Sequence, residues 1–380
     1  MVLCDVQAND ATHAPISVAP RTLLKSQVAR ADAMGFKALA ATELEYYMFE
    51  TSYREAFRQK YDDLERFSDY VEDYHILQGA REEVFNRPAR QMLKDSGITV
   101  ENSKGEAAIG QHELNVCYND AVAMADDHMV YKQCMKELAE EQRMSVSFMA
   151  KPFSDEAGSS CHVHLSLWDA AGDNNSCDPP PPFPCVPPRS IDSLSRAPLP
   201  VFVGPHGPLG CSDQLLQFLA GWIKYTPEVC VFMAPTINSY KRFKEGSWAP
   251  TRLAWSFDNR TAGFRVVGSG KSLRIECRIP GADVNPYLLL SASIAAGLRG
   301  IEEKLSPPPM FEGDMYQASK LPRVPRSLDH AISLFDSSAF ARETFGDEVV
   351  DHYVNFYAAE QAAFEGTVTE WERIRYFERI

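Results

Sequence analysis

The segment KALAATELEYYMF, residues 37–49, is the clearest structural signal in this chain. Side chains two positions apart on a strand point to the same face. Glu43 and Glu45 therefore project side by side, while apolar residues face the other way. This alternation is typical of an antiparallel strand with one buried and one polar face. The segment predicts such a strand, with two carboxylates on its polar face.

Three other segments place charged side chains on one face in the same way. They are CHVHL (161–165) with His162 and His164, LRIECR (273–278) with Arg274, Glu276 and Arg278, and GEAAIGQHELNV (105–116) with Glu106 and Glu113 on either side of a Gly-Gln turn. Any one of them is ordinary, because the exposed face of an antiparallel strand usually carries charges. If they converge on one cavity, five carboxylates and a histidine repel one another unless cations neutralise them.

The residue types at these positions favour Mg²⁺ or Mn²⁺ over zinc, which prefers cysteine and histidine. Arginines accompany the carboxylates, at Arg242, Arg260, Arg265, Arg274 and Arg278. Divalent ions and guanidinium groups together are typical of phosphoryl transfer, which depends on positioning and charge neutralisation. The chain has no P-loop, dinucleotide-binding fingerprint or H-E-x-x-H motif. The residues alone therefore predict metal-dependent chemistry on an anionic substrate, and an unrelated hydrolase stays open as an alternative.

The composition narrows the class of protein. The chain has 380 residues, 45% hydrophobic and 24% charged, which is typical of a globular protein with one large domain or two. Its formal net charge of −14 argues against a nucleic-acid partner, and no apolar run is long enough to span a membrane. Nine scattered cysteines without a C-x-x-C pair, and an N-terminus unlike a secretory signal, favour a reducing, cytoplasmic location.

Seven motifs, in this order, resemble the type I glutamine synthetase family, and in particular its glutamate–amine ligase branch, which includes γ-glutamylpolyamine and γ-glutamylethanolamide synthetases. They are TELE (42–45), GEAAIGQHE (105–113), GSSCHVH (158–164), NSYKR (238–242), DNR (258–260), RIECR (274–278) and NPY (285–287). The resemblance implies an α+β catalytic domain, in which a curved antiparallel sheet flanked by helices forms an active-site funnel. ATP enters this funnel at one end and glutamate at the other.

The resemblance also implies a domain organisation. Residues 1–20 match the end of the family's N-terminal β-grasp domain, which is otherwise expected to be largely absent, and residues 21–380 match the catalytic domain. A proline-rich segment containing DPPPPFPCVPPRS (178–190) interrupts the catalytic domain at about 172–212. Because proline lacks an amide hydrogen and fixes φ, we expect a disordered insertion there.

The family's metal ligands fall on residues of matching type. Glu45, Glu106 and Glu113 resemble the ligands of a first metal ion. Glu43, His162 and Glu276 resemble those of a second ion, which bridges the phosphates. The resemblance thus implies two or more Mg²⁺ or Mn²⁺ ions in each site.

The resemblance assigns the remaining roles to arginines and their neighbours. Those for glutamate and the amine are Gly158, Arg242, Trp248 and Arg278; those for ATP are Arg260, Arg265, Lys271 and Arg274; and those for catalysis are Arg260, Arg278 and Glu276. The implied reaction has two steps: the γ-carboxylate of glutamate attacks the γ-phosphate of ATP, and an amine then displaces phosphate from γ-glutamyl phosphate. The implied partners are glutamate, ATP, an amine and further copies of the chain in a ring, although absence of the β-grasp domain would remove part of the subunit contact. A catalytically silent relative that keeps the fold stays open.

Trp248 departs from true glutamine synthetases. There, the loop after the S-Y-K-R motif carries a glutamate that binds ammonium, whereas this chain reads FKEGSW (243–248). An ammonium ion is best surrounded by carboxylates, while an aromatic face suits the stem or the cationic head of a larger amine. The sequence therefore predicts an alkylamine or polyamine acceptor in preference to ammonia.

Overall fold

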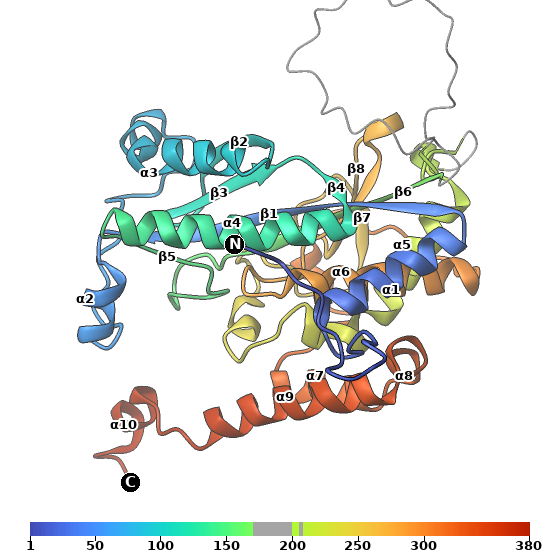
Figure 1. Ribbon diagram of the computed structural model, residues 1–380. Coiled ribbons are helices and arrows are strands. Elements are labelled where there is room, and N and C mark those ends of the chain that lie inside the picture. The colour runs from blue at the N-terminus through green and yellow to red at the C-terminus, as the bar shows by residue number, and fades with distance from the viewer. Residues whose placement is uncertain (170–199, 205–207) are drawn as a thin grey trace, which may run out of the picture.

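The computed structural model describes residues 1–169, 200–204 and 208–380 and arranges them around one sheet (Figure 1). Within these residues the strands are β1 (Phe36–Phe49), β2 (Val100–Gly105), β3 (Gln111–Val116), β4 (Asn119–Asp120), β5 (Ser145–Ser147), β6 (Cys161–Asp169), β7 (Trp255–Phe257), β8 (Phe264–Val267) and β9 (Arg274–Cys277). Their order is β2-β3-β1-β6-β9-β8-β7, with β4 and β5 paired to β1. The pairing is antiparallel, as predicted, except that β7 and β8 are parallel.

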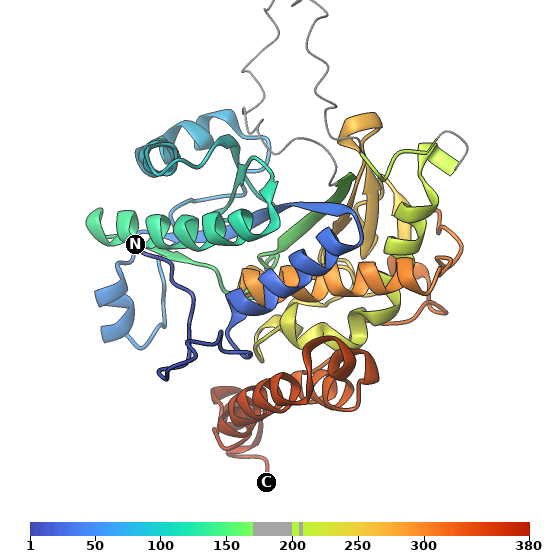
Figure 2. The same cartoon turned by 45° about the vertical axis from the view of Figure 1, so that its right-hand side comes forward.

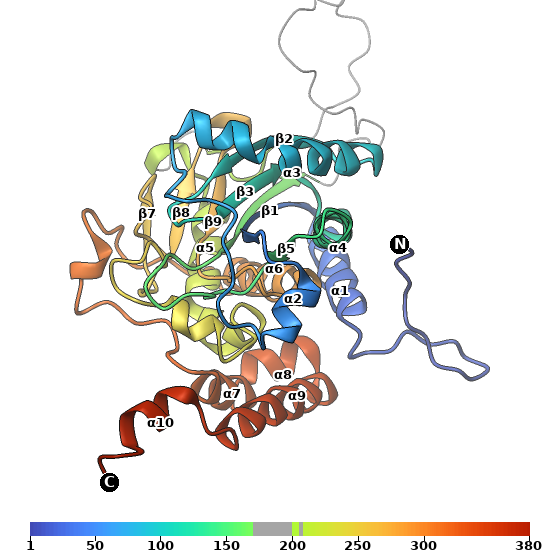
Figure 3. The ribbon, with the colours of Figure 1, turned by 90° about the vertical axis from the view of Figure 1, so that its left-hand side faces the viewer.

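Helices pack on the sheet and on one another. They are α1 (Pro20–Ala33), α2 (Tyr53–Arg58), α3 (Ile76–Asp95), α4 (Ala121–Glu141), α5 (Asp213–Tyr225), α6 (Pro286–Glu302), α7 (Leu328–Asp336), α8 (Ala339–Phe345), α9 (Asp347–Glu365) and α10 (Glu370–Tyr376). Figure 3 shows α1 and α4 side by side along β1, with α7, α8 and α9 grouped below the sheet. In Figure 2, α1 also lies against α6. None of the helices in the described residues is long and apolar enough to cross a membrane.

The helix starts follow signals in the sequence. Pro20 and Pro286 each predict the start of a helix, because a residue in the first turn needs no amide hydrogen. α1 and α6 confirm both starts. The side chain of Asn285 caps α6 by accepting hydrogen bonds from the amides of Tyr287 and Leu288, at 3.1 and 3.3 Å. Apolar residues recur every three or four positions over residues 121–138, which predicts a helix, and α4 confirms it.

α5 and α6 meet backbone to backbone. A Cβ atom at Gly300 would lie 2.1 Å from the carbonyl oxygen of Gln217, and one at Gly221 would lie 2.3 Å from that of Ala296. Only glycine fits at such distances, so these two positions fix how closely the helices pack.

Two predictions from local patterns are wrong. The amphipathic pattern of residues 51–98 predicts a largely helical segment, but the chain between α2 and α3 is irregular. Four of its residues have left-handed backbone angles, at φ values of 48–65°, which end any helix: Lys60, Tyr61, Asp63 and Tyr74. The sequence around Val2–Val6 also predicts a short strand. The described residues form none there, and a single bridge joins Gln7 and Pro15 instead.

The predicted insertion at about 172–212 falls mainly on residues 170–199 and 205–207, which lie outside the described residues. Its described end is packed, contrary to the expectation of disorder. Phe202 is fully buried and meets Phe218 of α5 at a ring-centroid distance of 5.5 Å. Residues 200–204 and 208–212 therefore belong to the folded body, because an aromatic side chain there finds a place in the core.

Candidate active site

The register of the sheet brings the predicted residues together from separate strands. Glu43 on β1 lies directly opposite His162 on β6, and Glu45 lies opposite Glu113 on β3. On the next strand, β9, Glu276 pairs with His164 of β6 on one side and with Arg265 of β8 on the other. The polar faces of β3, β1, β6, β9 and β8 thus form one continuous charged surface.

The first predicted metal group is assembled. One carboxylate oxygen from each of Glu45, Glu106 and Glu113 lies within 4.8 Å of the other two. Burial, followed by the charges of Glu43 and Glu106, raises the pKa of Glu113 to about 10. Burial and Glu106 likewise raise the pKa of Glu45. Carboxylates held this close favour a shared cation, and all-oxygen donors fit Mg²⁺ or Mn²⁺.

Hydrogen bonds orient this group. The amide of Ser160 donates to Glu45 at 2.7 Å, and the side chain of Asn115 donates to Glu113 at 2.9 Å. Lys104 lies on β2, two residues before Glu106. It pairs with Glu106, and its Nζ atom lies 3.8 Å from Glu113. Lys104 was not predicted as a site residue, although the i, i+2 spacing that united Glu43 with Glu45 also places it on the same face as Glu106.

The second predicted group centres on His162. Its Nδ1 atom lies 2.8 Å from Glu43 and 3.7 Å from Glu276. Burial alone would raise the pKa of Glu276, but the charges of His162 and Arg278 outweigh burial and lower it to about 2. The same balance, with His162 as the main partner, holds the pKa of Glu43 well below its usual range. Two ionised carboxylates beside an imidazole are a donor set that suits Mn²⁺ or Mg²⁺.

Two arginines share the Glu276 carboxylate. Arg265 donates to one oxygen at 2.8 Å, and Arg278 donates to the other at 2.7 Å. Arg278 also lies 3.4 Å from His162. The geometry brings these guanidinium groups to the second metal group, where an anionic substrate would meet both.

Arg242 lies beneath the same surface, at one end. Its guanidinium is buried and donates to the hydroxyl of Ser160 at 3.1 Å and to the carbonyl of Ile279. Gly158 packs on its stem, since a Cβ there would lie 2.6 Å from Arg242 Cγ. Burial lowers the pKa of Arg242. The predicted neighbours Gly158 and Arg242 are therefore in contact.

A cavity of about 450 Å³ opens at the other end, between β1, β6, β9 and the outer strands. Glu43, His164, Lys271 and Arg274 line it, and Arg274 donates to His164 at 3.1 Å. His164 was paired with His162 by the sequence pattern but was not assigned to the site. The predicted Arg260 does not line this cavity, because it lies exposed in the turn between β7 and β8.

Trp248 lies outside these groups, on the loop after Arg242. It is 57% exposed, and its backbone is left-handed, with φ at 62°. The next residue of this loop is held by Tyr316, whose hydroxyl donates to the carbonyl of Ala249 at 2.9 Å. The loop thus presents an exposed aromatic side chain to the solvent.

Comparisons with known proteins agree with this geometry. The family model described as glutamine synthetase, catalytic domain, matches residues 17–182 and 192–376. The chain is 40% identical to gamma-glutamylethanolamide synthetase GlnA4 of Streptomyces coelicolor. The alignment covers all of this chain and 75% of that protein. It is 35% identical to glutamate–isopropylamine ligase of a Pseudomonas species, in an alignment that covers all of this chain and 77% of that protein.

A solved structure titled GmaS/ADP complex superposes with a TM-score of 0.81 at 28% identity, covering 96% of this chain and 79% of that one. The apo form of GmaS gives a TM-score of 0.79. The predicted resemblance and the α+β fold class are confirmed by these matches. The chain therefore belongs to the glutamine synthetase family and contains that family's catalytic domain.

Proposed function

We propose that this protein is an ATP-dependent ligase that joins glutamate to an amine through γ-glutamyl phosphate. The observation that carries the proposal is the register that gathers Glu43, Glu45, Glu113, His162 and Glu276 on one surface. The relatives named as ligases of glutamate with ethanolamine or isopropylamine support the amide-forming reaction.

Two or more Mg²⁺ or Mn²⁺ ions are proposed as cofactors. Glu45, Glu106 and Glu113 would hold one, and Glu43, His162 and Glu276 would hold another. Such ions neutralise carboxylate and phosphate charge when bound. The protein's own part is to hold these donors close together, and the hydrogen bond from the Ser160 amide orients Glu45 for that purpose.

ATP is proposed to occupy the 450 Å³ cavity, with its phosphates directed toward Glu276. Lys271 and Arg274 line the cavity, and Arg265 reaches the same carboxylate from β8. One guanidinium group can bind two oxygens of a phosphate at once, so Arg265 and Arg274 would orient the γ-phosphate. Arg260 would have to approach from its exposed turn to join them.

Glutamate is proposed to bind at the opposite end, near Arg242, Gly158 and Arg278. The buried Arg242 guanidinium supplies a positive charge for an α-carboxylate, and Gly158 lets the backbone pack against the stem of that arginine. Arg278 would lie between this substrate and the transferred phosphoryl group, because it already contacts Glu276 and His162. This position suits a group that stabilises charge as phosphate leaves.

The amine is proposed to be an alkylamine or polyamine, received by the loop that carries Trp248. We further propose a cytoplasmic homo-oligomer, a β-grasp origin for residues 1–20 and a catalytic domain over residues 21–380. The cysteines of the described residues are all free, which is consistent with a reducing compartment.

The test is an assay of phosphate release from ATP with Mg²⁺ or Mn²⁺, glutamate and a panel of ammonia, ethanolamine, putrescine and spermidine. We expect release that depends on both glutamate and amine, with product identified by mass spectrometry. Glu276→Gln should abolish it, whereas Glu312→Gln, an exposed carboxylate, should not. Absence of glutamate-stimulated release with every amine would refute the ligase, and faster formation of glutamine than of any other amide would refute only the preference for larger amines.

A further inference from the structure

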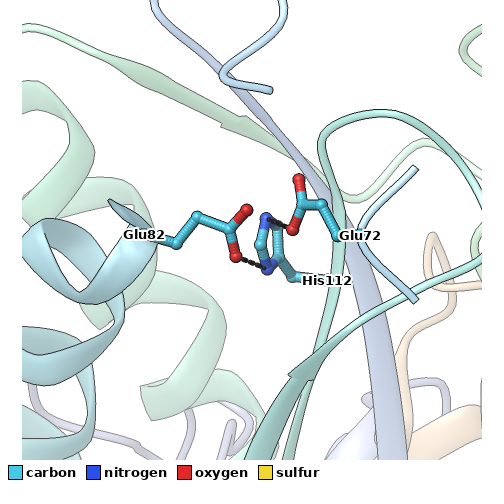
Figure 4. A group of neighbouring side chains, drawn as sticks. All are labelled: Glu72, Glu82 and His112. Carbon is cyan, nitrogen blue, oxygen red and sulfur yellow. Dashed lines mark ion pairs between the residues drawn. The ribbon is translucent and has the colours of Figure 1, made fainter. Parts of the chain in front are cut away.

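Three buried side chains form a second cluster on the side of β3 that faces away from the metal ligands (Figure 4). His112 of β3 lies between Glu82 of α3 and Glu72 of the segment that precedes α3. Its Nδ1 atom is 3.2 Å from a Glu82 oxygen, and its Nε2 atom is 3.1 Å from a Glu72 oxygen. The three residues are 0%, 1% and 3% exposed, in the order His112, Glu82 and Glu72.

Within the part of the chain that the structure describes, the cluster has no external counter-ion. Among the described residues, no lysine or arginine forms an ion pair with Glu72 or Glu82, and the hydroxyl of Ser68 contacts both carboxylates. Burial raises the pKa of Glu82 to about 8 and lowers that of His112 to about 4. Both ring nitrogens lie at ion-pair distance from a carboxylate, although neither contact has the geometry of a hydrogen bond. Polar groups buried this deeply are tolerated only beside one another, so the cluster connects α3 and β3.

This link lies directly behind the first metal group. His112 precedes Glu113, and the two side chains leave β3 on opposite faces. Glu72 also packs on Gly105, which precedes Glu106, since a Cβ at Gly105 would lie 2.5 Å from Glu72 Cβ. The backbone positions of both Glu106 and Glu113 are therefore set by residues in contact with Glu72.

We infer that Glu72, Glu82 and His112 act as positioning residues that hold Glu106 and Glu113 in the geometry needed to bind the first metal ion. The inference rests on the proposed function, which supplies that ion. One donor atom from each of the three residues lies within 4.8 Å of the others, which is close enough for a metal ion. An ion contacts only one nitrogen of an imidazole, however, and here each nitrogen faces a different carboxylate, which favours the positioning role.

Glu82→Ala tests the inference, because Glu82 is distant in sequence from the metal ligands and reaches them only through the other members of the cluster and Ser68. Mn²⁺ binding, measured by calorimetry, should show one class of site weakened about 10- to 100-fold and the other unchanged, with activity restored by excess Mn²⁺. Glu82→Gln, which keeps a hydrogen-bonding group beside the ring, should rescue the affinity. Glu83→Ala is the matched control, because Glu83 is the neighbour of Glu82 on α3 but pairs with Arg90 and not with His112.

Each other outcome contradicts the inference in its own way. A lower melting temperature with both Mn²⁺ affinities unchanged would make the cluster purely structural. Loss of one equivalent of bound Mn²⁺ with unchanged activity would make the cluster a metal site. If the wild-type protein is a ligase but Glu82→Ala matches it in Mn²⁺ affinity, the inference alone fails; if the wild type binds no Mn²⁺, the proposed function fails with it. Should Glu82→Ala not fold, Ser68→Ala provides a milder variant, expected to shift the same class of site.

Discussion

At the scale of single residues, Glu113 shows how the metal site opposes the stability of the metal-free protein. Its folded pKa of about 10 lies far above the ordinary value, because burial and neighbouring carboxylates disfavour its charge. A raised folded pKa gives a contribution to stability that is complete below the unfolded pKa and is lost as the pH rises through the folded one. Without metal, Glu113→Gln should therefore raise the free energy of unfolding by about 1–3 kcal/mol at pH 8, and less at pH 5.

Urea denaturation in EDTA at pH 5, 7 and 9 measures this effect, and Glu101→Gln, an exposed carboxylate on β2, is the control. The same Glu113 variant should bind Mn²⁺ at least about tenfold more weakly, since a carboxylate ligand has been lost. A variant that is less stable than wild type at every pH would mean that Glu113 is held by favourable contacts, with no repulsion to relieve.

The sequence showed which residues of the site share one face of a strand, but not which residues on other strands they contact. The i, i+2 alternation placed Glu43 and Glu45 together because that spacing is local. It could not show that Glu43 would face His162, since the register between β1 and β6 is set by contacts about 120 residues apart in the chain. Lys104 and His164 were missed for the same reason, because their roles depend on which strand lies beside them.

At the scale of elements, the crossing of α5 and α6 makes a prediction about packing. Gly300→Ala should destabilise the protein by about 2–4 kcal/mol, because its Cβ would meet the backbone carbonyl of Gln217, which cannot move aside without shifting α5. Gly79→Ala on α3 is the matched control, since nothing lies within 4 Å of a Cβ there. It should stabilise by about 0.5–1 kcal/mol through helix propensity. Equal effects in thermal unfolding would contradict the close approach of the two helices.

The loop over residues 243–249 makes a prediction about the amine. Trp248→Ala should raise the KM for the preferred amine about tenfold, because an aromatic face contributes about 1–2 kcal/mol to a bound cation. The KM values for glutamate and ATP should not change, and Trp248→Phe should restore most of the amine affinity. Phe57→Ala on α2, which removes another exposed aromatic side chain, is the control. If all three KM values rise together, Trp248 shapes the loop and does not contact the amine.

At the scale of the whole molecule, sequence patterns predicted the regular parts and failed where tertiary contacts decide the backbone. The helix starts at Pro20 and Pro286 follow from local chemistry and were correct. Residues 59–75 carry no comparable signal, and their path is set by contacts such as the bridge between Phe49 and Arg66. Phe202 lay in a proline-rich context that suggested disorder, yet the core accepts it. A single apolar side chain near such a segment is a weak signal, because burial depends on a pocket formed elsewhere.

The C-terminal helix α10 bears on the proposed assembly. None of its residues is buried, and Trp371 and Ile374 are 63% and 75% exposed, followed by Phe377 at 84%. Apolar side chains so exposed on one subunit gain about 25 cal/mol for each Å² that a neighbouring subunit covers. Trp371→Asp combined with Phe377→Asp should therefore lower the mass of the assembly in light scattering while leaving the melting temperature of the subunit unchanged. Arg373→Asp on the same helix controls for added negative charge, and an unchanged mass in the double variant would show that α10 lies outside the subunit contacts.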